Sequence, residues 1–171
     1  MVSKKFFINI VIYLLILCNI PLYYLYTQKN TESEIRLVAL YNLYEGGLYA
    51  DVHLTNVLNL SDKKHLLYAY ADLYSALKAH RHFIIMLGID TEEDVIGFYS
   101  NMIKTWIEQD ILPSDEVLQS AITDINMIRD TLWRWEETPG KHKAANIFGW
   151  DKNAYEENIK QLKGNLLLFS E

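Results

Sequence analysis

The chain has 171 residues and a formal net charge of −6, and half of its residues are hydrophobic. Lys4 and Lys5 precede every acidic residue, so the remainder carries 14 basic against 22 acidic residues. This balance argues against nucleic-acid binding and against electrostatic docking on anionic lipids. With only three prolines and seven glycines, long disorder and a turn-rich all-β fold are also disfavoured.

Residues 6–26 form a stretch without a charged side chain, long enough to cross about 30 Å of hydrocarbon as a helix. A cleaved signal peptide needs small residues before the cut, but this segment ends in tyrosines at positions 23, 24 and 26. A lipoprotein signal needs a small residue before Cys18, where the chain has Leu17. We therefore favour an uncleaved signal anchor, with cleavage and lipidation as open alternatives.

Charges beside the anchor predict its orientation. Lys4 and Lys5 lie on its N-terminal side, which favours a cytoplasmic N-terminus. The predicted organisation is a cytoplasmic segment at 1–5, a transmembrane anchor at 6–26 and an extracytoplasmic helical domain at 27–171. The expected location is the cell membrane, with a single membrane pass.

The segment 31–59 is the least clear of the predicted helices. Its apolar residues fit a helical spacing, but Gly46 and Gly47 interrupt it, each at a cost of about 1 kcal/mol. After the glycines, apolar and polar residues alternate with the period of a strand. No other segment alternates well enough to pair with such a strand. The prediction is a helix with a kink or a break at the glycines.

Four later segments have helical periodicity and recognisable ends. The first spans 61–88, with Ser61 as the expected N-cap and Gly88 just past the C-terminus. The second begins at 91–94, with Thr91 as the expected cap and acids in the first turn, and the third follows Pro113. The fourth has Asp151 as N-cap, with Trp150 and Tyr155 spaced as a hydrophobic staple. The predicted fold class is all-α, a transmembrane helix followed by an antiparallel bundle of four to five helices.

The spacing of histidine and acidic residues along the sequence does not favour a metal site. His80 and His82 lie two residues apart, as do Asp51 and His53, so neither pair shares a helix face. Asp62 and His65 have a suitable spacing but lack further ligands. No nucleophile elbow or phosphate-binding loop is present. We therefore expect no catalytic residue, metal or cofactor, and the question of enzymatic activity stays open, leaning to none.

His80 is the most notable single residue, since it falls within an apolar helical stripe. One interpretation is that it contacts a ligand or acts as a pH-sensitive group. The other is that it is a buried histidine bonded to a tyrosine hydroxyl or a carbonyl. Tyrosines are concentrated in this segment and in the segment 31–59. This fits either an aromatic pocket or ordinary packing between the helices. The candidate pocket consists of Tyr41, Tyr44, Tyr70, Tyr74 and His80.

Trp133 is the candidate partner contact, because it points away from the face that Trp135 shares with the core. The alternative is that the loop after Pro139 covers it. The function expected from these features is a non-enzymatic interaction module of the bacterial cell envelope. Its partners would be the membrane, through residues 6–26, and another envelope protein. The alternative is a bundle that senses a small molecule or pH through the pocket around His80.

Overall fold

A computed structural model describes Tyr23, Tyr26 and residues 39–40, 42–44, 46–89, 94–132 and 150–169. The chain divides into two compact units, Met1–Ala39 and Leu40–Glu171, and nearly all of the described residues belong to the second unit. Its described residues are helical and contain no strand, so the predicted all-α class is confirmed. Among the described residues, no helix combines the length and apolar character required to cross a bilayer. The predicted anchor at 6–26 lies outside them, apart from Tyr23 and Tyr26.

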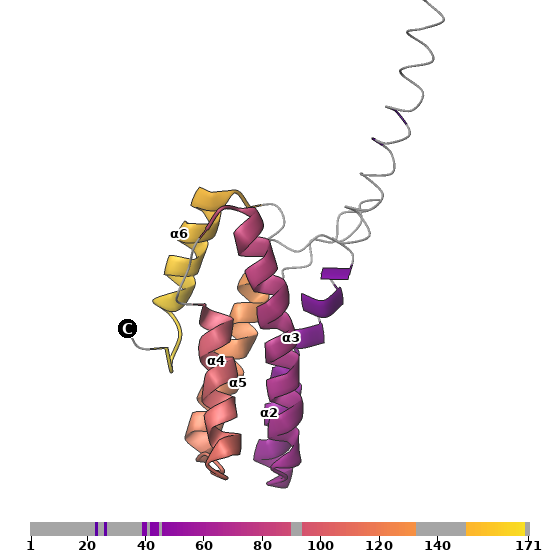
Figure 1. The fold of residues 1–171 in the computed structure, drawn as a ribbon. Helices are drawn as coiled ribbons and strands as arrows, with labels where there is room; N and C mark the ends of the chain where they lie inside the picture. The colour runs from indigo at the N-terminus through magenta and orange to yellow at the C-terminus, as the bar shows by residue number, and fades with distance from the viewer. Residues whose placement is uncertain are drawn as a thin grey trace, which may run out of the picture. The chain divides into compact units, whose positions relative to one another are not determined.

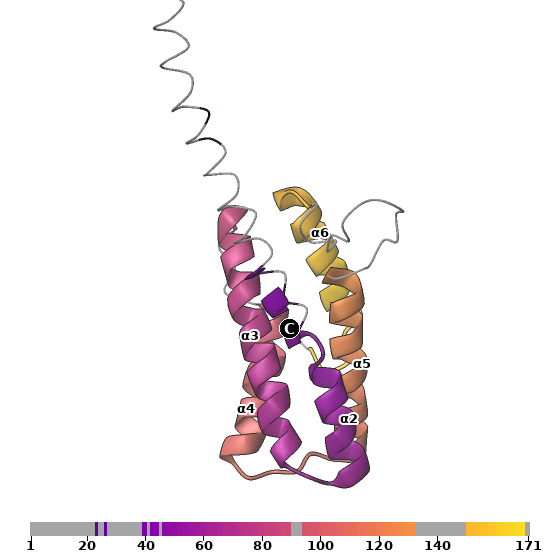
Figure 2. The same cartoon turned by 90° about the vertical axis from the view of Figure 1, so that its right-hand side faces the viewer.

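The described part of the second unit contains α2 (Ala50–Leu60), α3 (Lys64–Met86), α4 (Val95–Glu108), α5 (Asp115–Leu132) and α6 (Lys152–Lys163). These form a helical bundle, as predicted. Helix α3 packs against α2 and α4, and α2 also packs against α5. Figures 1 and 2 show α2 to α5 running alternately down and up, with α6 beside the upper part of α5.

The connection between α2 and α3 differs from the prediction in one detail. Ser61 is not the N-cap of α3; it has a left-handed φ of 52°, and its N–H donates to the Val57 carbonyl to end α2. The carboxylate of Asp62 instead accepts from the N–H of Lys64 at 3.1 Å. Serine and aspartate are both good capping residues, so the sequence pattern could not choose between neighbours. Gly88 follows α3 with a φ of +67°, as predicted for a residue just past a helix.

Helix α4 begins later than predicted, because Asp94, expected in the first turn after a cap at Thr91, is itself the N-cap, whereas α6 begins as predicted. Asp94 is the N-cap of α4 and accepts from the N–H of Ile96 at 2.9 Å. Asp151 caps α6 in the same manner, accepting from Ala154 at 2.8 Å. The rings of Trp150 and Tyr155 lie 6.4 Å apart, which confirms the predicted staple. Local capping chemistry therefore fixes where these helices start.

The helix is interrupted directly after the paired glycines. Gly46 and Gly47 are helical, Leu48 and Tyr49 form a turn, and α2 starts at Ala50. This confirms the predicted break and excludes the strand alternative. A Cβ at Gly47 would lie 2.6 Å from the amide nitrogen of Ala76, and closer still to the carbonyl oxygen of Asp72. The break therefore brings the chain against the backbone of α3, where only glycine fits.

Candidate functional site

The described residues bury a polar cluster at His80, where α3, the start of α4 and α6 meet. His80 is completely buried, and its Nδ1 lies 2.9 Å from Asp94 Oδ2. Its Nε2 lies 3.0 Å from the hydroxyl of Tyr155 on α6. The ring of Tyr44 lies alongside, with its centroid 6.0 Å from that of His80. Residues from four separate segments thus converge on one imidazole.

Local structure explains why Asp94 can hold His80. One carboxylate oxygen of Asp94 accepts from the N–H of Ile96 and caps α4, which leaves the other oxygen free to face α3. The carboxylate accepts from the Nδ1–H of His80, so in the neutral ring Nε2 is the acceptor for the Tyr155 O–H. Every polar atom of the imidazole is satisfied, as burial requires.

A carboxylate, an imidazole and a hydroxyl in this order are also the parts of a hydrolase triad. The hydroxyl here is unsuited to attack a substrate. Tyr155 is buried, and burial, with a smaller effect from the charge of Asp94, raises the pKa of its hydroxyl. A nucleophile needs access to its substrate, which this buried hydroxyl lacks. The cluster is therefore arranged to hold α3, α4 and α6 together. This is the second of the two interpretations of His80, a buried histidine bonded to a tyrosine hydroxyl.

The structure separates the candidate pocket residues into two groups. Tyr44 and His80 lie side by side in the core. Tyr70 and Tyr74 instead stack on each other, with ring centroids 5.7 Å apart, and Tyr74 is exposed. Tyr41 lies outside the described residues, as does Trp133, so a pocket at this place and a partner contact at Trp133 stay predictions.

Asp124 is a second buried carboxylate, and the sequence analysis missed it. It accepts from the Tyr99 hydroxyl at 2.5 Å and from the N–H groups of Leu167 and Leu168 at 2.8 and 2.9 Å. The residue ties the segment after α6 to α4 and α5. One sequence signal was present, because an acid directly before Ile125 stands beside the apolar stripe of α5.

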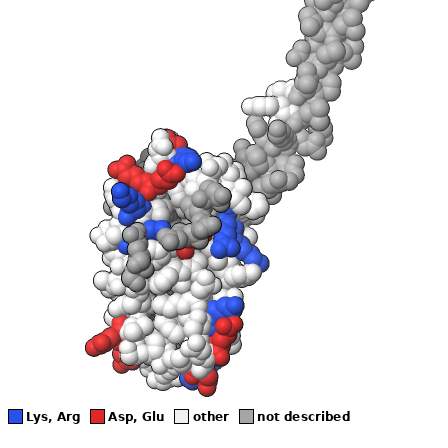
Figure 3. Space-filling view, turned by 60° about the vertical axis from the view of Figure 1, so that its left-hand side comes forward, with Lys and Arg blue, Asp and Glu red and all other residues white. Residues whose placement is uncertain are grey.

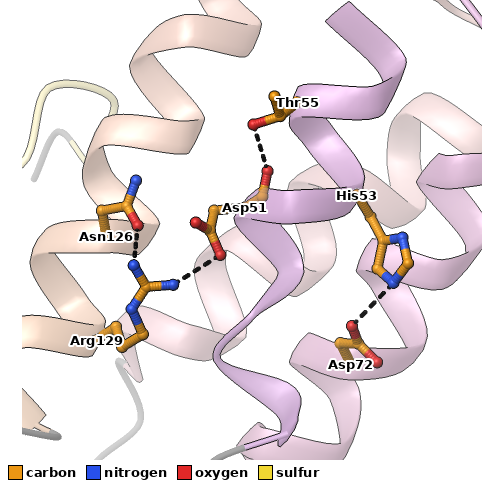
Figure 4. A network of polar contacts seen from close by, with 6 residues as sticks. All are labelled: Asp51, His53, Thr55, Asp72, Asn126 and Arg129. Atoms are coloured by element: carbon orange, nitrogen blue, oxygen red, sulfur yellow. Dashed lines mark hydrogen bonds and ion pairs between the residues drawn. The ribbon is translucent and has the colours of Figure 1, made fainter. Parts of the chain in front are cut away.

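Figure 4 shows two further contacts, both made by α2. Arg129 on α5 donates to Asp51 at 2.9 Å and also to the side chain of Asn126. On the other side of α2, His53 lies 3.4 Å from the carboxylate of Asp72 on α3. Asp51 and His53 thus have separate partners. Throughout the described ranges, no three His, Cys, Asp or Glu side chains are grouped to hold a metal ion.

An open groove runs along the first turns of α5, between Leu58 of α2 and Leu167. Asp115 and Glu116 line it, together with short polar side chains of α5. Small-molecule sites enclose most of their ligand in a largely apolar cavity. This groove is open and would not enclose a ligand, so it does not have that form.

The buried tyrosines lead to a prediction at alkaline pH. Burial is the main cause that raises the pKa values of Tyr44, Tyr99 and Tyr155, and the neighbouring Asp94 or Asp124 adds to it. A group whose pKa rises on folding stabilises the fold below its unfolded pKa, about 10 for tyrosine. Above that pH the unfolded chain loses the protons first. The three residues together should then lower the free energy of unfolding by about 4 kcal/mol per pH unit.

The measurement is an alkaline titration of the full chain in detergent, monitored by both phenolate absorbance and circular dichroism. The buried three should ionise only as the helical signal is lost. Complete ionisation of all twelve tyrosines in a fully helical protein would contradict this result.

Comparisons of the chain with protein-family models, with curated proteins and with solved structures find no match in any of the three.

Proposed function

We propose that the chain is a membrane-anchored helical protein that acts as a non-enzymatic interaction module of the bacterial cell envelope. Residues 6–26 would be its transmembrane anchor, residues 1–5 would be cytoplasmic, and residues 27–171 would form an antiparallel helical bundle outside the membrane. The bundle would act by binding another envelope protein. An uncharged segment of membrane-spanning length supports the anchor.

The observation that carries the proposed binding role is an apolar stripe on the outer face of α3. Leu67, Ala71 and Tyr74 follow one another at spacings of four and three residues, so they share one face of the helix. All three are exposed, Leu67 to 54% and Tyr74 to 42%. Tyr70 stacks on Tyr74, and the Lys78 amine lies 4.5 Å from the Tyr74 ring centroid. Exposed apolar residues gathered on one face are typical of a protein-binding surface.

The charge distribution also favours a protein partner. On the face shown in Figure 3, acidic residues lie mainly toward the two ends of the bundle, and basic residues also lie between them at the sides. The surface between them is formed largely by other residues. A surface of this kind suits contact with another protein better than contact with a polyanion, which needs dense positive charge.

The alternative of a sensing pocket receives less support. Such a pocket needs its tyrosines and His80 around one space, whereas Tyr74 faces outward and His80 inward. The hydrogen-bonding atoms of His80 are already engaged by Asp94 and Tyr155. A ligand would have to displace one of these contacts to reach the imidazole.

Photo-crosslinking of the full-length protein in its native membrane tests the binding role. A crosslinking residue in place of Tyr74 should give a discrete adduct with another protein. The same residue in place of Ile111, which is 44% exposed, serves as the matched control and should give none. Leu67→Asp should reduce the Tyr74 adduct about tenfold or more, as expected for a central interface residue. Equal adducts from both positions, or no effect of Leu67→Asp, would count against the proposal.

A further inference from the structure

We propose that α6 opens and closes as a unit over a partly polar surface of the other helices. The α6 unit is defined as residues 152–169, which comprise α6 and the segment that Asp124 holds. When this unit opens, α2 to α5 stay packed together, and His80 and Asp124 become accessible. The device involves neither the stripe of α3 nor the proposed anchor.

The first argument is that α2 to α5 form a closed bundle without α6. Helix α3 packs against α2 and α4, and α5 also packs against α2 and α4, so each of the four contacts two of the others. Helix α6 packs mainly against α5 and is not part of this ring (Figures 1 and 2). The four helices therefore keep one another as neighbours when α6 leaves α5.

The second argument is the small number of side chains that α6 buries. It buries three of its twelve residues, Tyr155, Ile159 and Leu162, whereas α4 buries six of fourteen. Leu166 adds one buried side chain in the segment that follows. Regions with few buried apolar contacts are the ones that open locally while the rest of a protein stays folded.

The third argument is the polar character of the surface beneath the α6 unit. Across the described ranges, the buried polar and charged side chains are Asp51, His80, Asp94, Ser100 and Asp124. His80 is bonded to Tyr155 of α6. Asp124 accepts from the N–H groups of Leu167 and Leu168. Water can take the place of these partners when the unit opens, whereas buried apolar contacts have no such replacement.

The open form presents a second binding surface for a helix. It consists of His80 on α3, Phe98 and Tyr99 on α4, and Asp124 on α5. In the closed form the ring of Phe98 packs against Phe169 of the α6 unit, with centroids 5.0 Å apart. Aromatic side chains beside an imidazole and a carboxylate suit an amphipathic helix that supplies hydroxyl or N–H donors, as the α6 unit does. The α6 unit thus blocks this surface until it opens.

Native-state hydrogen exchange of the full chain in detergent measures the opening. The amides of α6 should exchange together, and faster than those of α3 near Leu73. Tyr155→Phe removes the hydroxyl that donates to His80, and the loss of this buried hydrogen bond should raise the exchange rate of α6 about tenfold. Tyr74→Phe removes an exposed hydroxyl and is the matched control, for which no change is expected.

A substitution in the core distinguishes local opening from unfolding of the whole bundle. Leu66 is buried near the start of α3, about 21 Å from His80 along the helix. Leu66→Val destabilises the closed and open forms equally relative to the unfolded chain. It should therefore speed exchange in α2 and α3 and leave the exchange rate of α6 unchanged. Equal acceleration in α3 and α6 would show that α6 opens only when the whole bundle unfolds, and the inference would be wrong.

Chemical modification tests whether the opening exposes His80. Diethyl pyrocarbonate acylates accessible imidazole nitrogens, and His82 is an exposed reference two residues away on the same helix. His82 should react at once in every variant. His80 should react slowly, and about tenfold faster in Tyr155→Phe, in step with the exchange of α6. If His80 stays unreactive while α6 exchanges, α6 unwinds without leaving its surface, and the inference is wrong.

Discussion

Gly47→Ala should lower the free energy of unfolding of the bundle by about 3 kcal/mol. The added methyl group would overlap the backbone of α3 at Asp72 and Ala76, where no flexible side chain can move aside. Overpacking against a rigid neighbour typically costs 1–3 kcal/mol, and the backbone contact places this site at the upper end. Either α2 and α3 separate locally or the break before α2 is distorted. Urea denaturation of the full-length protein in detergent, followed by circular dichroism, measures the change.

Gly46→Ala is the matched control, one residue away. A Cβ at this position would meet nothing within 4 Å, and Gly46 is both helical and exposed. Alanine should therefore leave the stability unchanged or raise it by about 0.5–1 kcal/mol, because it is the better helix former. Similar losses in the two variants would show that helix geometry, and not contact with α3, determines the need for glycine here.

Asp124→Ala should be the second highly destabilising substitution, by about 4 kcal/mol. It would leave the Tyr99 hydroxyl and the N–H groups of Leu167 and Leu168 without their acceptor. The Tyr99 hydroxyl is buried, and a buried donor that loses its partner costs about 1–3 kcal/mol. The two part-buried N–H groups each add a smaller cost, and removal of the buried carboxylate offsets part of the sum. The same denaturation experiment gives the loss. Hydrogen exchange at Leu167 and Leu168 should also become faster, since both amides depend on this carboxylate.

Asp130→Ala is the control on the same helix. Asp130 is exposed on α5, and surface substitutions of this kind usually change stability by less than about 0.5 kcal/mol. Asp124→Asn adds a graded test, because an amide keeps one acceptor oxygen and should cost less than alanine. A stable Asp124→Ala variant with unchanged exchange at Leu167 would contradict the proposed anchoring of this segment.

The features that the sequence predicted well depend on residues close to one another in the chain. Gly88 and Asp151 mark helix ends through backbone conformation and contacts within a few residues. The apolar stripes of α4, α5 and α6 likewise supply much of the core. Even the error at Ser61 is local: the neighbouring Asp62 makes the capping contact instead.

The buried polar contacts were less predictable, because their partners come from distant parts of the chain. The position of His80 in an apolar stripe indicated burial, but Tyr155 lies 75 residues away in sequence. Asp124 contacts the backbone of Leu167 and Leu168, whose N–H groups leave no sequence signature. Residue type and spacing can indicate that a polar group is buried. They cannot identify its partner until the helices are packed together.

The buried groups of α3 and α5 have a consequence for the timing of folding. The Nε2 atom of His80 and the carboxylate of Asp124 obtain partners from Tyr155 and from Leu167 and Leu168, near the end of the chain. A growing chain that has reached only α5 lacks both sets of partners, although its apolar stripes can already associate. Such an intermediate keeps these two groups accessible to water. The bundle therefore closes fully only after Leu167 and Leu168 have been synthesised.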